Sequence, residues 1–149
     1  MFDKHQVIGL GCDHAGFCLK EHIKKHLDLL GYTVKDYGTF SQESVDYPDF
    51  IHPLAKDIDK GILKAGIILC GSGNGVSMVA NKYSGVRAAV CWNEEITKLS
   101  RAHNDANVLA LPARFISDDL ADRCVQAFLE TDFEGGRHER RVRKISEIL

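Results

Sequence analysis

Apolar and polar positions alternate along this chain in a pattern that predicts short strands followed by amphipathic helices. Short apolar runs bounded by turn residues are typical of buried strands. We expect five strands, at residues 7–11, 33–37, 65–70, 87–91 and 108–111. Apolar residues three or four positions apart are typical of helices that bury one face. We expect such helices at residues 17–30, 48–60, 75–82, 94–103 and 117–131.

Residue choices at the expected helix ends agree with this pattern. Asn93 and Ser117 each precede two acidic residues, which places an N-cap and a favourable charge at the start of a helix. Pro48 suits a first helical turn, and Gly31 suits the end of a helix. A regular alternation of strand and helix predicts an α/β fold with a parallel sheet that is covered by helices on both faces.

The last stretch, residues 139–149, predicts a sixth helix. It places Val142, Ile145 and Leu149 on one side and basic residues elsewhere. The segment follows a glycine break at residues 134–136 and is too short to be stable alone. We therefore expect it to dock either on its own chain or on a partner subunit.

Composition narrows the class of protein. With 149 residues, 44% of them hydrophobic, the chain is expected to form one domain, residues 1–149, around a substantial core. A net charge of -2 provides no bulk attraction to nucleic acid or to an anionic membrane, and no apolar segment approaches the roughly 20 residues that cross a bilayer. Five cysteines without a CxxC pair, and no leader pattern, predict a reduced cytoplasmic protein.

The strongest chemical signal lies at residues 67–75, where an apolar run ends at Cys70 and turns into the loop Gly71-Ser72-Gly73-Asn74-Gly75. Ligands of an open parallel sheet gather outside the carboxyl ends of its strands. A thiol near a helix N-terminus has its thiolate favoured and can act as a base or nucleophile. The loop matches neither GxGxxG nor a P-loop, so nucleotide binding does not follow. A buried strand cysteine beside a tight turn is the alternative.

The other four cysteines lack such a loop. Cys12 and Cys91 follow expected strands, whereas Cys18 and Cys124 lie in expected helices. Core packing is favoured for all four because a free thiol behaves as a small apolar group.

A second polar cluster, His103-Asn104-Asp105, ends an expected helix and could hydrogen-bond a sugar, although a helix-capping turn explains it equally well. Because it precedes a strand, it should lie at the amino-terminal edge of the sheet, opposite Cys70 of the same subunit. If both serve one site, an oligomer is the simplest way to unite them.

Arg137 and Arg141 are four apart, so they share a helix face and could converge on a phosphate; a solvated basic face is the alternative.

Together these motifs resemble a known family, the B-type ribose-5-phosphate isomerases with the related galactose-6-phosphate isomerase subunits. The similarity covers almost the whole chain, and the order and spacing of the motifs make it specific. The motifs are Gly11-Cys12-Asp13-His14-Ala15-Gly16, Asp46-Tyr47-Pro48, the Cys70 to Gly75 loop with Ala80-Asn81-Lys82, Ser100-Arg101-Ala102-His103-Asn104-Asp105 and Glu134-Gly135-Gly136-Arg137-His138.

The resemblance implies a Rossmann-like three-layer fold with a five-stranded parallel sheet and an extra C-terminal helix. It implies interconversion of D-ribose 5-phosphate and D-ribulose 5-phosphate through an enediolate, in the non-oxidative pentose phosphate pathway and without metal or cofactor. It also implies a homodimer or a dimer of dimers with a site shared between subunits. Some members use a glutamate one residue beyond the glycine loop in place of the cysteine; this chain has Val76 there and resembles the cysteine branch.

The resemblance also implies roles for individual residues. Cys70 is the expected base that moves a proton between C2 and C1, and His103 is the expected acid that opens the furanose ring. The expected substrate contacts are Asp13, His14, Gly71, Ser72, Gly73, Asn74, Gly75 and Asn104. The expected phosphate clamp consists of Arg114, Arg137 and Arg141. Removing a proton next to a carbonyl requires a base poised near neutral pH and donors for the enediolate, which a thiolate and loop amides supply.

Three alternatives remain open at the level of sequence. The first is an isomerase of a six-carbon sugar phosphate, such as allose or galactose 6-phosphate. The second is a sugar-phosphate binding protein without turnover, since a fold alone never proves activity. The third is a zinc enzyme that uses Cys12, His14 and Cys70, although these residues have no recognised zinc spacing.

Overall fold

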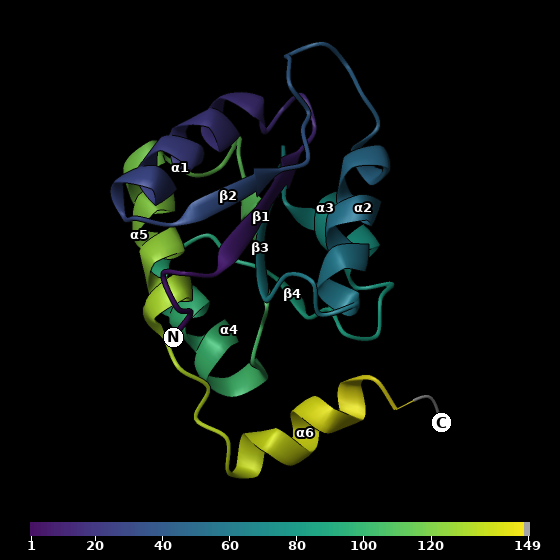
Figure 1. Cartoon of the computed structure of the whole chain (residues 1–149), viewed down its shortest axis with the longest axis vertical. Helices are drawn as coiled ribbons and strands as arrows, with labels where there is room; N and C mark the ends of the chain where they lie inside the picture. Colours follow the sequence, from purple (N-terminus) through teal and green to yellow (C-terminus); the bar gives the residue numbers. More distant parts are fainter. Residues whose placement is uncertain (148–149) are drawn as a thin grey trace.

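The computed structural model describes residues 1–147 and contains a five-stranded sheet in the order β2-β1-β3-β5-β4 (Figure 1). Every neighbouring pair of strands is parallel, which confirms the predicted α/β fold. The strands are β1 (Val7–Cys12), β2 (Thr33–Asp36), β3 (Ala65–Cys70), β4 (Ala88–Val90) and β5 (Val108–Pro112).

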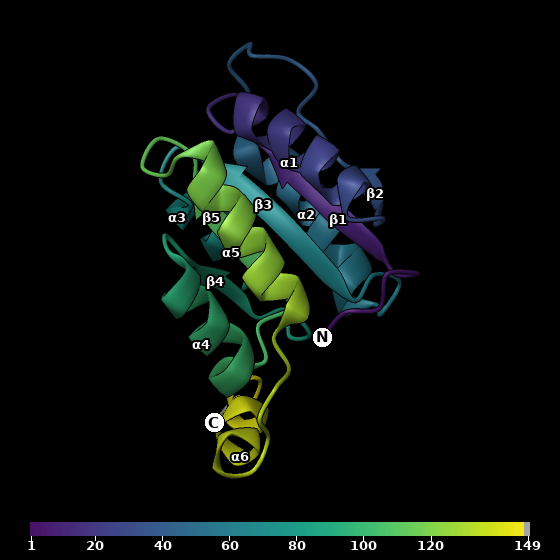
Figure 2. The same cartoon turned by 90° about the vertical axis from the view of Figure 1, so that its left-hand side faces the viewer.

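Helices cover both faces of this sheet and form three layers. The helices are α1 (Phe17–Leu29), α2 (Tyr47–Asp59), α3 (Asn74–Ala80), α4 (Glu94–Asn104), α5 (Asp118–Glu130) and α6 (Arg137–Ile145). Helices α1, α4 and α5 lie on one face, and α2 and α3 lie on the other (Figures 1 and 2). None of the helices within residues 1–147 is long and apolar enough to cross a membrane.

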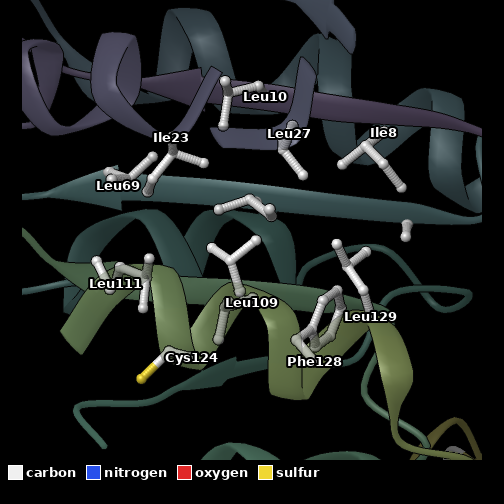
Figure 3. Packing of buried hydrophobic residues seen from close by; sticks show 14 of the residues in the cluster. Ile8, Leu10, Ile23, Leu27, Leu69, Leu109, Leu111, Cys124, Phe128 and Leu129 are labelled. Carbon is white, nitrogen blue, oxygen red and sulfur yellow. The ribbon is translucent and has the colours of Figure 1, made fainter. Parts of the chain in front are cut away.

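Strand periodicity divides the core into two hydrophobic clusters. Alternate residues of a strand point to opposite faces, so Leu69 enters the cluster beneath α1 and α5, whereas Ile68 and Cys70 enter the cluster beneath α2 and α3. Figure 3 shows the first cluster, where Ile23 and Phe128 pack from α1 and α5 against the sheet.

The order of the strands creates a switch point between β1 and β3. From β1 the chain crosses outward to β2, whereas from β3 it builds the other half of the sheet, with β5 inserted between β3 and β4. The loops that leave the carboxyl ends of β1 and β3 therefore diverge, and a crevice opens between them. The strand pattern alone does not predict this order.

Helix α6 confirms the predicted C-terminal helix and differs from the prediction at both ends. It begins at Arg137, after Gly135 and Gly136, both of which have positive φ, and it ends at Ile145. Leu149, which the sequence placed on its apolar side, lies outside the described residues. The helix lies beyond the amino-terminal end of the sheet, next to α4 (Figure 1), and 58% of the Ile145 surface is exposed.

Candidate active site

The carboxyl ends of β1, β3 and β5 border a cavity of about 530 Å³. It lies at the switch point of the sheet, where ligands of open parallel sheets bind. Its wall includes Tyr47, the first residue of α2, and residues of the loop that precedes this helix. Seven of the predicted site residues line it: Asp13, His14, Cys70, Gly71, Ser72, Gly75 and Arg114.

Cys70 is the last residue of β3, and only 5% of its surface is exposed. Backbone hydrogen bonds tie its surroundings to the end of β5: the Ala113 N–H donates to the Cys70 carbonyl at 2.9 Å, and the Arg114 N–H donates to the Gly71 carbonyl at 3.1 Å. The thiol and the Arg114 backbone are therefore held in a fixed relation on the same side of the cavity.

The glycine loop needs its glycines for steric reasons. Gly73 has φ 76°, and a Cβ at that position would lie 3.2 Å from the Val90 side chain. At Gly75 a Cβ would lie 2.8 Å from the ring of Tyr47, which packs directly against the loop. Gly73 and Asn74 do not line the cavity, because Gly73 is buried beneath the loop and Asn74 opens the first turn of α3. Contacts of these two residues with a substrate remain predictions.

Asp13 and His14 follow β1, and each is oriented by backbone groups. One oxygen of the buried Asp13 carboxylate accepts the N–H groups of Ala15 and Gly16 at 2.9 and 3.1 Å. The Val45 N–H donates to Nδ1 of His14 at 3.3 Å. Since Nδ1 is the acceptor, Nε2 carries the proton of the neutral ring. Asp13 and His14 thus place a carboxylate and an imidazole at the wall of the cavity.

The remaining cysteines differ from Cys70 in their surroundings. Burial raises the pKa of Cys12 to about 12 and also raises the pKa of Cys91 and Cys124, so these three thiols stay protonated as core residues. The prediction that Cys18 is a core residue was wrong. Cys18 is exposed because it lies off the face of α1 that packs on the sheet, and its Sγ accepts a hydrogen bond from the Gln42 side chain at 2.7 Å.

A buried lysine supports the same edge and was missed in the sequence. Lys20 is fully buried, and its Nζ donates to both oxygens of Asp36 at 2.8 and 2.7 Å. Burial alone would raise the pKa of Asp36, but hydrogen bonds from Lys20, Lys24 and the Gly38 N–H outweigh it and hold that pKa below its ordinary value. Lys20 falls within the apolar stripe of α1, next to Leu19, and a charge in such a stripe was the available signal.

His103 lies in the last turn of α4, before β5, and hence at the amino-terminal edge of the sheet as predicted. Its ring stacks on His138 of α6, with centroids 4.2 Å apart and planes 5° from parallel. The Glu134 carboxylate lies 3.7 and 3.8 Å from the Nε2 atoms of the two rings. Burial lowers the pKa of His138, and the neighbouring His103 and Arg137 lower it further.

Two groups of residues contain possible metal ligands, His103 with Glu134 and His138, and Cys12 with His14 and Cys70, and neither has a geometry that suits a metal ion. Ligand atoms of His103, Glu134 and His138 lie within 4.8 Å of one another. A metal ion lies near the plane of each imidazole that binds it, and one ion cannot lie in two parallel planes that are stacked face to face. The zinc site considered from the sequence fails as well, because Cys12 and Cys70 enter clusters on opposite faces of the sheet.

The predicted arginines divide between the two edges of the sheet. Arg114 borders the Cys70 cavity, whereas Arg137 and Arg141 are exposed near the start of α6. Asn104 lines a separate hollow of about 490 Å³ between α3, α4 and the end of α6. Within one chain, therefore, His103, Asn104, Arg137 and Arg141 are not brought to Cys70.

Comparison with known proteins identifies the family. Residues 8–145 match the family model described as Ribose/Galactose Isomerase. The chain belongs to this family. Its sequence is 45% identical over 141 residues to ribose-5-phosphate isomerase B of Escherichia coli (strain K12), covering 95% of each protein.

Solved structures of the family share the fold over nearly their full length. The crystal structure of a ribose 5-phosphate isomerase from Thermotoga maritima has a TM-score of 0.94 and 49% identity, covering 97% of this chain and 99% of the other. Ribose-5-phosphate isomerase B from Mycoplasma genitalium, solved with bound ribulose-5-phosphate, has a TM-score of 0.90 and 42% identity over 94% of this chain and 93% of the other.

Proposed function

We propose that this chain, acting as a single isomerase domain over residues 1–149, interconverts D-ribose 5-phosphate and D-ribulose 5-phosphate. The observation that carries the proposal is the cavity at the switch point, where Cys70 ends β3 beside a glycine loop and Arg114 borders the same space. Relatives of the same family, named as ribose-5-phosphate isomerases and similar over almost their whole length, support it.

In this proposal Cys70 is the base. Its thiolate takes the proton from C2 of the open-chain aldose, the electron pair shifts to the carbonyl oxygen, and an enediolate forms. A proton passes from the oxygen on C2 to the oxygen on C1, the same thiol returns its proton to C1, and the carbonyl forms at C2, so no cofactor is consumed. Backbone N–H groups of Gly71 and Ser72 stabilise the negative charge of the enediolate, since fixed donors in a water-poor site lower such a barrier strongly.

The phosphate serves as a non-reacting handle. Arg114 binds it from the Cys70 side, with His14 and Asp13 holding the sugar hydroxyls. Arginine suits this task because its planar fork binds phosphate oxygens in pairs. Binding energy at the phosphate then holds C1 and C2 near the thiolate, where proton transfer requires them.

The proposal includes a site shared between subunits of a homodimer or a dimer of dimers. His103, which opens the furanose ring, and Asn104, Arg137 and Arg141 would reach the Cys70 cavity from the partner chain. Their position at the opposite edge of the sheet supports this arrangement, as does the exposed apolar surface of Ile145 on α6. We further propose the cytoplasm as its location, where the five free thiols would stay reduced.

The test compares sugar phosphates of five and six carbons and follows solvent deuterium. The proposal expects kcat/KM for ribose 5-phosphate to exceed that for allose or galactose 6-phosphate by at least about 10-fold, because one extra carbon in a fitted pocket costs about 1–3 kcal/mol. It also expects deuterium from heavy water at C1 of ribulose 5-phosphate. A reversed preference would establish a six-carbon isomerase, and binding without any exchange would establish a sugar-phosphate binding protein.

A further inference from the structure

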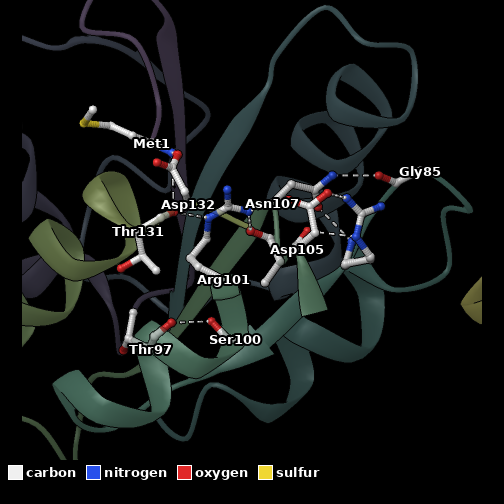
Figure 4. Close-up of polar contacts among 11 residues, drawn as sticks. Met1, Gly85, Thr97, Ser100, Arg101, Asp105, Asn107, Thr131 and Asp132 are labelled. Atoms are coloured by element: carbon white, nitrogen blue, oxygen red, sulfur yellow. Dashed lines mark hydrogen bonds and ion pairs between the residues drawn. The ribbon is translucent and has the colours of Figure 1, made fainter. Parts of the chain in front are cut away.

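Arg101 is almost fully buried at the amino-terminal edge of the sheet, two residues before His103. Its guanidinium has three acceptors: Nη1 donates to the Asp105 carboxylate at 2.9 Å and to the Ala106 carbonyl at 2.6 Å, and Nε donates to the Thr131 carbonyl at 3.3 Å. Figure 4 shows Arg101 between Asp105 and Thr131. The aromatic ring of Phe2 lies 4.5 Å from the guanidinium carbon. One side chain thereby joins α4, the approach to β5, and the segment that leads to α6.

Asp105 is held in an unusual conformation by this contact. It has φ 47°, in the left-handed region that few residues other than glycine adopt, and it is the only such non-glycine residue in the described chain. Its second carboxylate oxygen accepts from Arg87 Nη2 at 2.8 Å, and its carbonyl accepts from Arg87 Nε at 2.8 Å. Two guanidinium groups therefore fix the turn that directly follows His103 and Asn104.

The cluster of Arg101, Asp105 and Arg87 also sets the path of the chain toward α6. The Arg101 bond to Thr131 fixes the exit from α5, and the Glu134 N–H donates to the Ala102 carbonyl at 3.0 Å. These bonds hold the Glu134 carboxylate beside the stacked pair of His103 and His138. The orientation of the His103 ring thus depends on the end of α4 and on the segment between α5 and α6, which these bonds join.

Nothing in the cluster is easily replaced. A buried ion is tolerated only when it is paired, and loss of Asp105 would leave the buried guanidinium of Arg101 without its counterion. The cluster is therefore expected to hold a single arrangement rather than to adjust gradually when a member is removed.

We propose that Arg101 is a positioning residue, which acts through Asp105 and the Thr131 carbonyl to fix the imidazole of His103 for opening the sugar ring. This rests on the proposed function, in which His103 is the ring-opening acid. Nε and Nη1 of Arg101 donate to protein acceptors, and its side chain is almost fully buried, so Arg101 is not expected to touch the sugar phosphate.

The experiment separates ring opening from proton transfer. Ribose 5-phosphate must be opened before C2 is attacked, whereas ribulose 5-phosphate stays open, because the oxygen that would close its five-membered ring carries the phosphate. Arg101→Met should lower kcat for ribose 5-phosphate by about 10²-fold, the scale expected when a catalytic group is misplaced by about 1 Å. Deuterium exchange at C1 of ribulose 5-phosphate, which requires the base but no ring opening, should continue near the wild-type rate.

Two further variants and one surface control protect the test against misfolding. Arg101→Lys keeps the charge but loses the planar fork, and should recover part of the ribose 5-phosphate rate. Asp105→Asn keeps the shape and tolerates the left-handed conformation, and should show the same selective loss to a smaller degree. Arg123→Met removes an arginine that pairs with Asp119 on the surface of α5, and should change neither rate.

Equal loss of both rates in folded Asp105→Asn and Arg101→Lys would overturn the positioning role, since it would show a general structural effect. So would unchanged rates in both. A wild-type protein that neither converts ribose 5-phosphate nor exchanges deuterium would instead overturn the proposed function, and this inference with it.

Discussion

The two edges of the sheet position polar residues by different physical means. At the carboxyl edge, Cys70 and Arg114 are set by backbone hydrogen bonds and by a loop whose glycines permit close contacts. At the amino-terminal edge, His103 is set by side chains, through the buried pairing of Arg101 with Asp105. The first edge relies on backbone hydrogen bonds and on glycines that permit close contacts, whereas the second relies on hydrogen bonds made by the side chain of Arg101.

This difference explains which edge can be recognised in a sequence. A strand that ends in cysteine and glycines is a contiguous signal, and it predicts a ligand-binding loop by itself. The His103 cluster resembles any helix-capping turn until the Thr131 and His138 contacts are known. Predictions that compare the edges therefore test whether they serve one reaction.

The largest effect is expected from Cys70→Ala. Loss of the base should lower kcat by about 10³-fold while ribose 5-phosphate binding is largely retained, since general bases contribute about 10²–10⁴-fold. Cys12→Ala is the matched control, because Cys12 ends the neighbouring strand on the opposite face and burial keeps its pKa at about 12. It should lower stability by about 1 kcal/mol and leave kcat near the wild-type value. Steady-state kinetics and calorimetric titration would measure both, and near-normal turnover of Cys70→Ala would contradict the assignment.

A mixture of inactive variants should regain activity if the edges meet across subunits. Cys70→Ala and His103→Asn, mixed in equal amounts and allowed to exchange subunits, form hybrids in which one of two sites is complete. About a quarter of the wild-type activity should return.

The control for this mixture uses one edge only. Cys70→Ala mixed with Arg114→Ala leaves every site defective, because both residues border the same cavity of one chain. Activity that fails to return in the first mixture, or that returns equally in both, would show that the edges do not form a shared site.

The smallest effect concerns stability in acid. Because the folded pKa of Asp36 lies below its ordinary value of 3.8, the stability gained from its ionised form is present above that pH and is lost as the pH falls below it. Asp36→Asn should cost about 1–3 kcal/mol at pH 7, and the difference from wild type should shrink toward pH 3. Urea unfolding at both pH values measures this. Asp119→Asn, on the exposed surface of α5, should show little change, and a pH-independent difference for Asp36→Asn would contradict the role of its charge.

Much of the fold was predictable because its signals are local. Hydrophobic periodicity predicted every strand and helix to within a few residues, and the residues following β1 and β3 pointed to the carboxyl edge. The roles of Cys70, His103 and the arginines remain proposals, because they depend on how a bound sugar phosphate lies in the site.

The rest depended on contacts that periodicity does not encode. Insertion of β5 between β3 and β4 is a choice of neighbours, and each strand would look the same in another order. Lys20 carries a charge into the core, where only its pairing with Asp36 makes it tolerable. Cys18 was misassigned because a cysteine fits either side of an amphipathic helix and its position relative to the sheet decides its exposure.

The sheet order also bears on how the chain is completed during synthesis. β4 is the edge strand next to β5, so a nascent chain that ends near residue 104 can join β1, β2 and β3 but has no place for Ala88–Val90. Only when residues 108–112 emerge does the edge strand gain its neighbour. On the ribosome, β4 and α4 would thus be synthesised before β5, the strand with which β4 pairs. β4 would then lack its hydrogen-bonding neighbour at a stage of synthesis when misfolding is favoured.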